Sequence, residues 1–312
     1  MSNLLSPGIN VLIDGQWGST GKGKLSAFLA DSSDVVYNTA DFQPNAGHTV
    51  VLGDKKFVTK AIPSGFVNLD ARLYLSPAST INVDTLLSEI EMLEDYGVQN
   101  RLSIHPMAGV VTQEDIDEER QTMRGIASTM TGGGAALRRK IARKAITAQD
   151  IPELRRWVHD RTTDLAAVAH AGGTILAETA QGFDLSLNHG HKYPYTTSRD
   201  VTTAGVLANL GLPPQLMSRC WASMRTLPIR VGHLIVNGEK VGDSGPYYRD
   251  QQELTWQQVQ AMTGSKSVAP ELTTVTKRVR RIFTWSMMQY TRFLVSCHPT
   301  DIFINFVLML EL

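Results

Sequence analysis

The sequence has few cysteines, no excess charge of either sign and no long apolar run. Two cysteines, Cys220 and Cys297, are too few for a disulfide framework and lack the spacing of metal ligands, which fits a reducing compartment. Thirty Lys and Arg balance thirty Asp and Glu, so no overall field favours a nucleic acid or membrane partner. No apolar run approaches the roughly 20 residues that span a bilayer, and the first ten residues lack a secretion-signal pattern. We therefore expect a cytoplasmic protein.

What is present is the composition of a globular enzyme, with 312 residues of which 42% are hydrophobic. Short apolar runs alternate with segments of helical periodicity, and this pattern predicts an α/β fold with a central, mainly parallel sheet and helices on both faces. We expect a single domain over residues 1–312 with inserted subdomains, the main one a helical insertion around residues 113–170. The expected strands are residues 10–13, 35–37, 72–75, 174–177 and 304–308, and the expected helices are residues 83–93 and 154–171.

A glycine-rich segment, residues 15–24, lies between the first expected strand and a helix. Its glycines allow backbone N–H groups to surround phosphate oxygens, and the helix start adds positive potential. Lys22 supplies a point charge, although glycine follows it where the common phosphate loop has Ser or Thr. The segment predicts a site for a nucleoside triphosphate. Its expected phosphate-binding residues are Gly18, Ser19, Thr20, Gly21, Lys22, Gly23 and Lys24.

Five further segments carry polar residues where a scaffold needs none: residues 45–49, 62–65, 180–182, 193–198 and 273–281. In this order, together with the loop, they closely resemble adenylosuccinate synthetase, which uses GTP to join aspartate to the 6-position of a purine nucleotide. The resemblance covers about residues 9–301. It implies an adenylosuccinate synthetase-like fold and a ligase that first phosphorylates the purine 6-oxygen and then lets the aspartate amine displace phosphate.

The resemblance also implies roles for single residues. His48 matches the catalytic histidine, an acid that stabilises the bridging oxygen during phosphate transfer, and Lys22 and Ser19 complete the expected catalytic set. Gly47, His48, Thr49 and Arg280 are expected beside the triphosphate. Mg²⁺ is the implied cofactor, with Gly47 and Ser19 as its expected contacts.

The nucleotide and aspartate sites follow from the same resemblance. The monophosphate nucleotide is expected at Ser19, Asn45, Ser128, Thr129, Arg143, Gln181, Thr197 and Arg278. Arg143 resembles an arginine that crosses to the partner's site, which implies a homodimer. Aspartate is expected at Thr274, Val275, Thr276 and Arg280, where hydroxyl and guanidinium groups can bind a carboxylate.

Ser19 departs from the family, which has at this position an aspartate that removes the purine ring proton. A serine hydroxyl is too weak a base for this near pH 7. Its small neutral side chain leaves room for an extra group such as the 2-amino group of guanine. A bacteriophage branch of the family is similar in this respect, so the expected substrate is dGMP and the expected product N6-succino-2-amino-2'-deoxyadenylate.

The second departure lies at residues 299–303, which resemble the segment that reads the guanine of GTP. A lysine is missing there, and Phe303 replaces the acidic partner. Each lost hydrogen-bond partner costs roughly 1 to 3 kcal/mol. The expected phosphate donor is therefore ATP or dATP.

Three other interpretations remain open. An ordinary adenylosuccinate synthetase would use IMP and GTP and tolerate Ser19. An inactive nucleotide-binding regulator would need no aspartate site, and a generic kinase or NTPase would not depend on aspartate.

Overall fold

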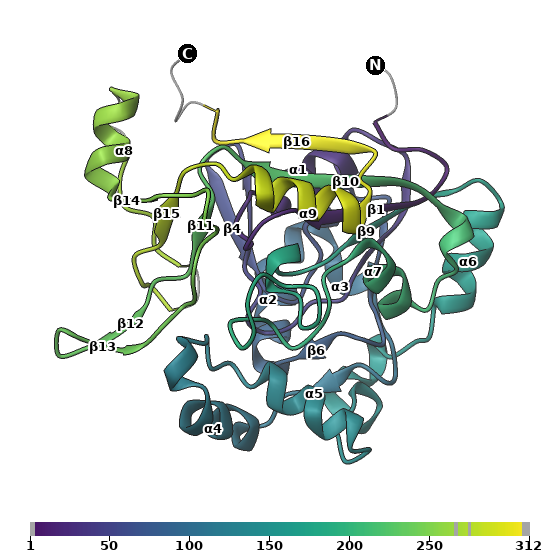
Figure 1. Cartoon of the computed structure of the whole chain (residues 1–312). Helices are drawn as coiled ribbons and strands as arrows, with labels where there is room; N and C mark the ends of the chain where they lie inside the picture. Colours follow the sequence, from purple (N-terminus) through teal and green to yellow (C-terminus); the bar gives the residue numbers. More distant parts are fainter. Residues whose placement is uncertain (1–3, 265–267, 274–275, 308–312) are drawn as a thin grey trace.

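The computed structural model describes residues 4–264, 268–273 and 276–307. Its centre is a sheet of seven strands, each paired in parallel with its neighbours (Figure 1). This architecture confirms the predicted α/β class. Across the sheet the order is β16 (Asp301–Asn305), β10 (Met217–Arg225), β1 (Gly8–Asp14), β9 (Thr174–Glu178), β2 (Val35–Ala40), β5 (Arg72–Leu75) and β7 (Leu102–Ile104).

β1 lies inside the sheet and is buried along its whole length. Successive side chains of a strand point to opposite faces. Leu12 accordingly packs with Leu25 of the first helix, whereas Val11 packs with Leu165 and Leu207 on the other face. Each such buried side chain contributes about 1.5 to 3 kcal/mol. The end of β1, where the glycine-rich loop begins, is thus held from both sides.

Helices cover both faces of the sheet. Thr112 and Asp115 start one of them with a capping box, in which each side chain accepts a bond from the other's backbone N–H. None of the described helices combines the length and apolar character that a membrane crossing requires. Their bounds are α1 (Lys22–Asp31), α2 (Val83–Met92), α3 (Val98–Arg101), α4 (Gln113–Thr122), α5 (Gly133–Ile141), α6 (Thr162–His170), α7 (Thr203–Leu210), α8 (Trp256–Thr263) and α9 (Met287–Cys297).

Short strands outside the central sheet form smaller sheets. The hairpin of β3 and β4 packs beside α1 and so brings its first residue, His48, to the glycine-rich loop. The pairs are β3 (His48–Leu52) with β4 (Lys55–Thr59), β6 (Thr80–Ile81) with β8 (Gly109–Val110), β12 (Leu234–Val236) with β13 (Glu239–Gly242), and β15 (Arg281–Phe283) with both β11 (Ile229–Arg230) and β14 (Glu253–Leu254).

The predicted helix over residues 154–171 is wrong as one element. A 3-10 helix ends at Trp157, and α6 begins only at Thr162. The helix is interrupted because Val158 is extended and bridges to Ile104. The carboxylate of Asp160 then accepts the Thr162 N–H at 2.9 Å where α6 begins. The predicted helical insertion thus contains α4, α5 and α6 as separate helices.

The last predicted strand is displaced. β16 covers Asp301–Asn305 and pairs with the end of β10, whereas the sequence indicated residues 304–308. Phe306 has φ of 61°, which ends the strand, and Leu308 lies outside the described residues. The apolar run misled the prediction because this edge strand leaves Ile302 and Ile304 partly exposed. The other predicted strands, and the helix over residues 83–93, are confirmed.

Candidate active site

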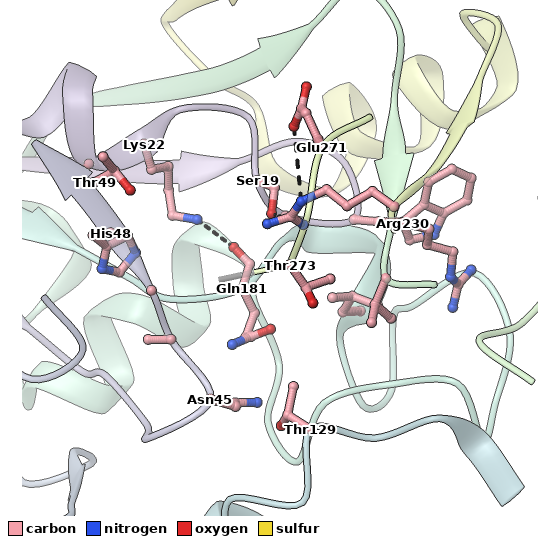
Figure 2. Close-up of a pocket in the computed structure, with 18 of the residues that line it drawn as sticks. Ser19, Lys22, Asn45, His48, Thr49, Thr129, Gln181, Arg230, Glu271 and Thr273 are labelled. Carbon is pink, nitrogen blue, oxygen red and sulfur yellow. Dashed lines mark hydrogen bonds and ion pairs between the residues drawn. The ribbon is translucent and has the colours of Figure 1, made fainter. Parts of the chain in front are cut away.

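A cavity of about 300 Å³ opens beside the end of β1 and the start of α1. It gathers most of the predicted site residues on one surface, and Figure 2 shows the Lys22 side chain reaching the backbone carbonyl of Gln181, whose own side chain points away from Lys22. The predicted residues that line it are Gly18, Ser19, Gly21, Lys22, Gly23, Asn45, Gly47, His48, Thr49, Thr129, Gln181, Thr276 and Arg280.

The glycine-rich loop turns through three left-handed residues. Gly18 has φ of 90°, Ser19 of 60° and Gly21 of 92°. Glycine adopts this region freely, whereas serine does so only when its surroundings hold it. The first N–H groups of α1 precede its first intrahelical bond, from Leu25 N to the carbonyl of Gly21, and are available to an anion. The loop therefore has the features of a phosphate site.

Asp14, which the sequence analysis did not single out, lies beneath this loop and is fully buried. Its Oδ1 accepts the N–H groups of Gln16 at 2.8 Å and Gly18 at 3.2 Å. Its Oδ2 accepts the N–H of Thr20 at 3.3 Å and the Thr20 hydroxyl at 2.6 Å, and lies 3.8 Å from Nζ of Lys22. One carboxylate thus fixes the loop along its length.

A second constraint on the loop comes from the segment after β9. Lys22 Nζ donates to the carbonyl of Gln181 at 2.7 Å, and Gln181 has φ of 68°. A Cβ on Gly182 would lie 2.3 Å from the carbonyl oxygen of Gln16 and 2.4 Å from N of Gly18. Only glycine fits this contact, so residue 182 sets the distance between the two segments.

His48 lies at the rim of the cavity with 6% of its surface exposed. Its ring packs 4.2 Å from that of Phe42. Burial, with a smaller effect from the positive charge of Lys22, holds the pKa of His48 well below its usual value, so the imidazole is neutral at pH 7. A neutral imidazole can donate a hydrogen bond to an oxygen that gains negative charge.

Glu178, at the end of β9, faces this histidine. Its Oε1 lies 3.8 Å from Nδ1 of His48, which is buried and has no hydrogen-bond partner among the described residues. Ser26 and Ser64 donate hydroxyl hydrogens to the carboxyl at 2.8 Å each, and the N–H of Ser64 donates at 2.9 Å. Burial nevertheless dominates and raises the pKa of Glu178 to about 7. The carboxyl can therefore hold or release a proton beside His48 near neutral pH.

Cations converge on Ser19. Arg280 Nη1 donates to its Oγ at 2.6 Å. Glu271 lies between two arginines, 4.0 Å from Nε of Arg280 and 2.7 Å from Nη2 of the fully buried Arg225. Burial lowers the pKa of Arg280, but a guanidinium stays charged at neutral pH. Arg225 Nη1 also donates to the Ser19 carbonyl at 3.4 Å, so two guanidinium groups and one carboxylate surround Ser19. The Ser19 oxygen accepts from Arg280, and its own hydroxyl hydrogen can point elsewhere.

A smaller cavity of about 100 Å³ adjoins the first. It shares Asn45, Thr129 and Gln181 with it and adds the predicted residues Ser128 and Thr197. Among the described residues, Oδ1 of Asn45 and Oγ1 of Thr197 are buried without a hydrogen-bond partner. Buried polar atoms normally have partners, so these two are suited to a polar ligand.

Arg278 contacts the loop that lines the smaller cavity. It donates to the carbonyl of Ala127 at 2.8 Å and to that of Ser128 at 3.1 Å. The side chain therefore braces the loop that carries Ser128, and it lines neither cavity.

The structure does not bring every predicted residue to the cavities. The hydroxyl of Thr20 is buried against Asp14, and Lys24 is exposed because α1 turns its side chain outward. Arg143 is exposed just after α5, with φ of 60°, and lines neither cavity. The predicted aspartate contacts Thr274 and Val275 lie outside the described residues.

Several cavity residues escaped the sequence analysis. Arg230 is buried, with its guanidinium 5.0 Å from the ring of Trp17, and donates to the carbonyls of Pro246 and Tyr195. No sequence motif surrounds Arg230, so the sequence could not predict its place in the site. Trp17 lies within the predicted phosphate loop, and that position could have identified it. Three lining residues lie within the predicted segments but were given no role: Trp17, Ala46 and Thr273. The lining residues outside those segments are Leu185, Arg230, Val231, Glu271 and Phe306.

The segment expected to meet the donor base, residues 299–303, enters the central sheet at Asp301 as the start of β16. Asp301 pairs with Arg219 at 3.0 Å, and Phe303 is partly buried against the core. Phe306, a few residues later, reaches the cavity, where the guanidinium of Arg225 lies 3.9 Å from its ring. An aromatic and cationic wall therefore stands beside the loop.

The predicted Mg²⁺ contacts are compatible with that ion in their chemistry. Gly47 and Ser19 both line the cavity and offer oxygen atoms, the donors that Mg²⁺ prefers. Within the described residues, no group of three or more His, Cys, Asp or Glu side chains is placed to hold a metal. This suits an ion that is bound largely by water and nucleotide phosphates.

A glycine-rich loop after a central strand, a buried neutral histidine and converging cations define a nucleotide-binding α/β enzyme built for chemistry at phosphate. The family model described as adenylosuccinate synthetase matches residues 11–157 and 150–305. The chain belongs to the adenylosuccinate synthetase family, whose members are ligases that form a C–N bond.

Phage proteins are among its similar relatives. The N6-succino-2-amino-2'-deoxyadenylate synthase of Vibrio phage phiVC8 is 37% identical over 96% of this chain and 85% of its own length. The cyanophage S-2L protein of the same name is 37% identical, with 95% and 82% covered. The adenylosuccinate synthetase of Pyrococcus horikoshii is 32% identical over 71% of this chain and 66% of its own length.

Solved structures agree with this grouping. The cyanophage S-2L succinoaminodeoxyadenylate synthetase, bound to dGMP and to dATP as an energy donor, superimposes with a TM-score of 0.82 at 36% identity, covering 96% of this chain and 85% of that one. Fully ligated adenylosuccinate synthetase from Plasmodium falciparum gives a TM-score of 0.78 at 20% identity, covering 96% and 76%, and shares the fold.

Proposed function

We infer that this enzyme joins L-aspartate to the 6-position of dGMP, with ATP or dATP as phosphate donor, and forms N6-succino-2-amino-2'-deoxyadenylate. The observation that carries the inference is Ser19, which places a small hydroxyl held by Arg280 at the tip of the phosphate loop. The phage relatives named for this product and the cyanophage structure with dGMP and dATP support it.

The first step transfers the terminal phosphoryl group of the donor to the 6-oxygen of guanine. The donor leaves as ADP or dADP, and the ring N–H proton passes to solvent. Lys22, anchored by the carbonyl of Gln181, lies where it can neutralise the transferring group. Neutral His48 donates a hydrogen bond to the bridging oxygen as charge develops there. Gly47 and Ser19 would help to hold Mg²⁺, which when bound would neutralise charge on the phosphates.

The second step forms the C–N bond. The aspartate amine attacks C6, the phosphate on the 6-oxygen leaves, and the amine loses a proton. Thr276 and Arg280 line the cavity at the proposed aspartate site, together with Thr273, whose Oγ1 lies 2.6 Å from that of Thr276. The Thr273 hydroxyl also accepts the N–H of Arg278 at 2.9 Å, which holds this loop in shape.

The smaller cavity suits the rest of the nucleotide. The free acceptors Asn45 Oδ1 and Thr197 Oγ1 lie at its lining with the hydroxyls of Ser128 and Thr129, and these groups are proposed to hold the sugar and monophosphate of dGMP. The exposed Arg143 is proposed to complete the phosphate site of a partner subunit in a homodimer. A phage enzyme of this kind would act in the host cytoplasm.

Two properties of Ser19, which stands where the family has aspartate, support dGMP as the substrate: its hydrogen-bonding capacity and its charged surroundings. The serine oxygen keeps a lone pair for the 2-amino group of guanine while it accepts from Arg280. Surrounding cations also favour a purine that has lost its ring proton, which lowers the need for a strong base.

Purified enzyme with Mg-ATP and aspartate should release phosphate with dGMP and form the N6-succinyl adduct. Turnover of IMP but not dGMP would instead establish ordinary adenylosuccinate synthetase activity. Phosphate release that does not depend on aspartate would indicate a kinase or NTPase. If no purine nucleotide gives phosphate release, the protein is an inactive nucleotide-binding regulator. A Ser19→Asp variant should lose dGMP activity or gain IMP activity.

A further inference from the structure

Asp14 is a charged group at the centre of the site that touches the loop rather than the cavity. It is the last residue of β1 and has no exposed surface. Its two oxygens bond the N–H groups of Gly18 and Thr20, the residues on either side of Ser19, at 3.2 and 3.3 Å. Ser19 itself is exposed and carries the strained φ of 60°.

These contacts decide where the Ser19 side chain points. A non-glycine residue keeps a left-handed conformation only when its neighbours determine it. The N–H of Thr20 bonds the carboxylate and so fixes the peptide unit that follows Ser19, and the N–H of Gly18 fixes the unit between Trp17 and Gly18. The short segment between these two anchors carries Ser19, which lines the cavity. The hydroxyl then meets Arg280 Nη1 at 2.6 Å.

We propose that Asp14 is the positioning residue for Ser19 and that its carboxylate aims the serine hydroxyl at the bound purine nucleotide. The part of this proposal that concerns the substrate rests on the proposed function, because Ser19 contacts a purine only if the purine lies at the loop tip. The geometric part is independent of which purine binds.

The number of donors explains why a carboxylate is needed. Three N–H groups and the Thr20 hydroxyl converge on Asp14, with the ammonium of Lys22 at 3.8 Å. An asparagine offers one oxygen, so its NH₂ group would face the donors of Thr20 or of Gln16 and Gly18. The loop would have to rotate away, and Ser19 would leave its left-handed conformation.

A double-mutant cycle tests the proposal. Asp14→Asn, Ser19→Ala and the double variant are compared by kcat/KM for whichever purine nucleotide the wild type turns over fastest, and by calorimetric affinity for dGMP and for ATP. Thr20→Val, which removes the 2.6 Å bond to Asp14, provides a milder form of the same perturbation.

We expect about a 10-fold loss of kcat/KM for Ser19→Ala and about a 100-fold loss for Asp14→Asn, in keeping with misplacement of a site residue. The kcat/KM of the double variant should be no lower than that of Asp14→Asn alone, because Ser19 is already displaced in the Asp14→Asn variant. The loss should fall on nucleotide affinity together with kcat, and Thr20→Val should show the same non-additivity with Ser19→Ala.

Glu89→Gln is the matched control. Glu89 is also buried and also accepts three backbone N–H groups, those of Lys60, Ala61 and Ile62, but it does not line the cavity. We expect its kcat/KM to stay within about 3-fold of the wild type at a temperature where it is folded.

Multiplicative losses in the Asp14→Asn and Ser19→Ala cycle, or an Asp14→Asn variant with wild-type kcat/KM, would overturn the proposal. If Asp14→Asn does not fold, the Thr20→Val and Ser19→Ala pair takes its place, and multiplicative losses of kcat/KM in that pair would overturn the proposal as well. Failure of dGMP turnover in the wild type would refute the proposed function alone, since the cycle is then measured with another nucleotide or by affinity.

Discussion

Replacing Glu178 by glutamine should change how stability depends on pH. Glu178 is almost completely buried, and its pKa is raised from 4.5 to about 7, mainly by burial. A shift of this size means that the ionised carboxyl costs the folded state about 3 kcal/mol. The folded protein therefore binds more protons than the unfolded chain between pH 4.5 and about 7, and the free energy of unfolding falls across this interval.

Glu178→Gln removes this dependence while it preserves most contacts. A glutamine oxygen can accept from Ser26 and from the N–H of Ser64, and its NH₂ group can donate to the partnerless Nδ1 of His48. Relative to the wild type, the variant should gain about 3 kcal/mol of stability as the pH rises from 4.5 to 8. The pH dependence of kcat/KM should also lose its transition near 7.

Urea unfolding followed by circular dichroism, at a series of pH values, measures the first effect. Asp184→Asn is a matched comparison, because that buried carboxyl has its pKa raised from 3.8 to about 6. Asp184→Asn should reduce the fall in the free energy of unfolding between pH 3.8 and 6. It should leave the transition of kcat/KM near pH 7 in place. Parallel stability curves for the wild type and Glu178→Gln would show that the pKa of Glu178 is the same in the folded and unfolded protein, and the reasoning would fail.

Gly182→Ala should weaken ATP binding by about 10-fold or more in calorimetry, since its Cβ would lie 2.3 Å from loop backbone; unchanged affinity would contradict the packing described. Lys22→Ala should lower aspartate-dependent phosphate release by about 100-fold or more, because it removes the charge nearest the transferring phosphate; a coupled phosphate assay with Lys22→Arg as the comparison measures this. Arg225→Leu should destabilise the fold by about 3 kcal/mol in urea unfolding, because it strips Glu271 of a 2.7 Å partner; a loss below about 1 kcal/mol would contradict this.

The sequence predicted the parts of the site that are built locally. The glycines of residues 15–24 predict a turn, and the short apolar run before them predicts a strand. The loop and its place after β1 could therefore be predicted. His48 and Gln181 were identified through motifs, and the β3–β4 hairpin brings the first to the cavity and the segment after β9 the second. Local chemistry of this kind does not depend on the order of the strands.

The remaining parts depend on pairings between distant segments. β10 was not predicted because Arg219, Ser223 and Arg225 interrupt its apolar pattern, and the buried Arg225 finds its carboxylate partner in the distant Glu271. Phe306 reaches the loop because β16 pairs with β10. The helix error at residues 154–171 has a similar origin, since Val158 leaves helical conformation to bridge with Ile104.

The position of β1 between β9 and β10 affects how the protein folds during its synthesis. Asn10 bonds a residue 165 positions further along the chain, and Gln16 one 209 positions further. The phosphate loop is thus synthesised early, yet its frame closes only after most of the polypeptide has left the ribosome, and such long-range contacts form slowly. Nucleotide cannot assist the early stages of folding. It instead binds only chains whose central strands have assembled, so occupancy of the loop reports a finished fold and protects it against global unfolding.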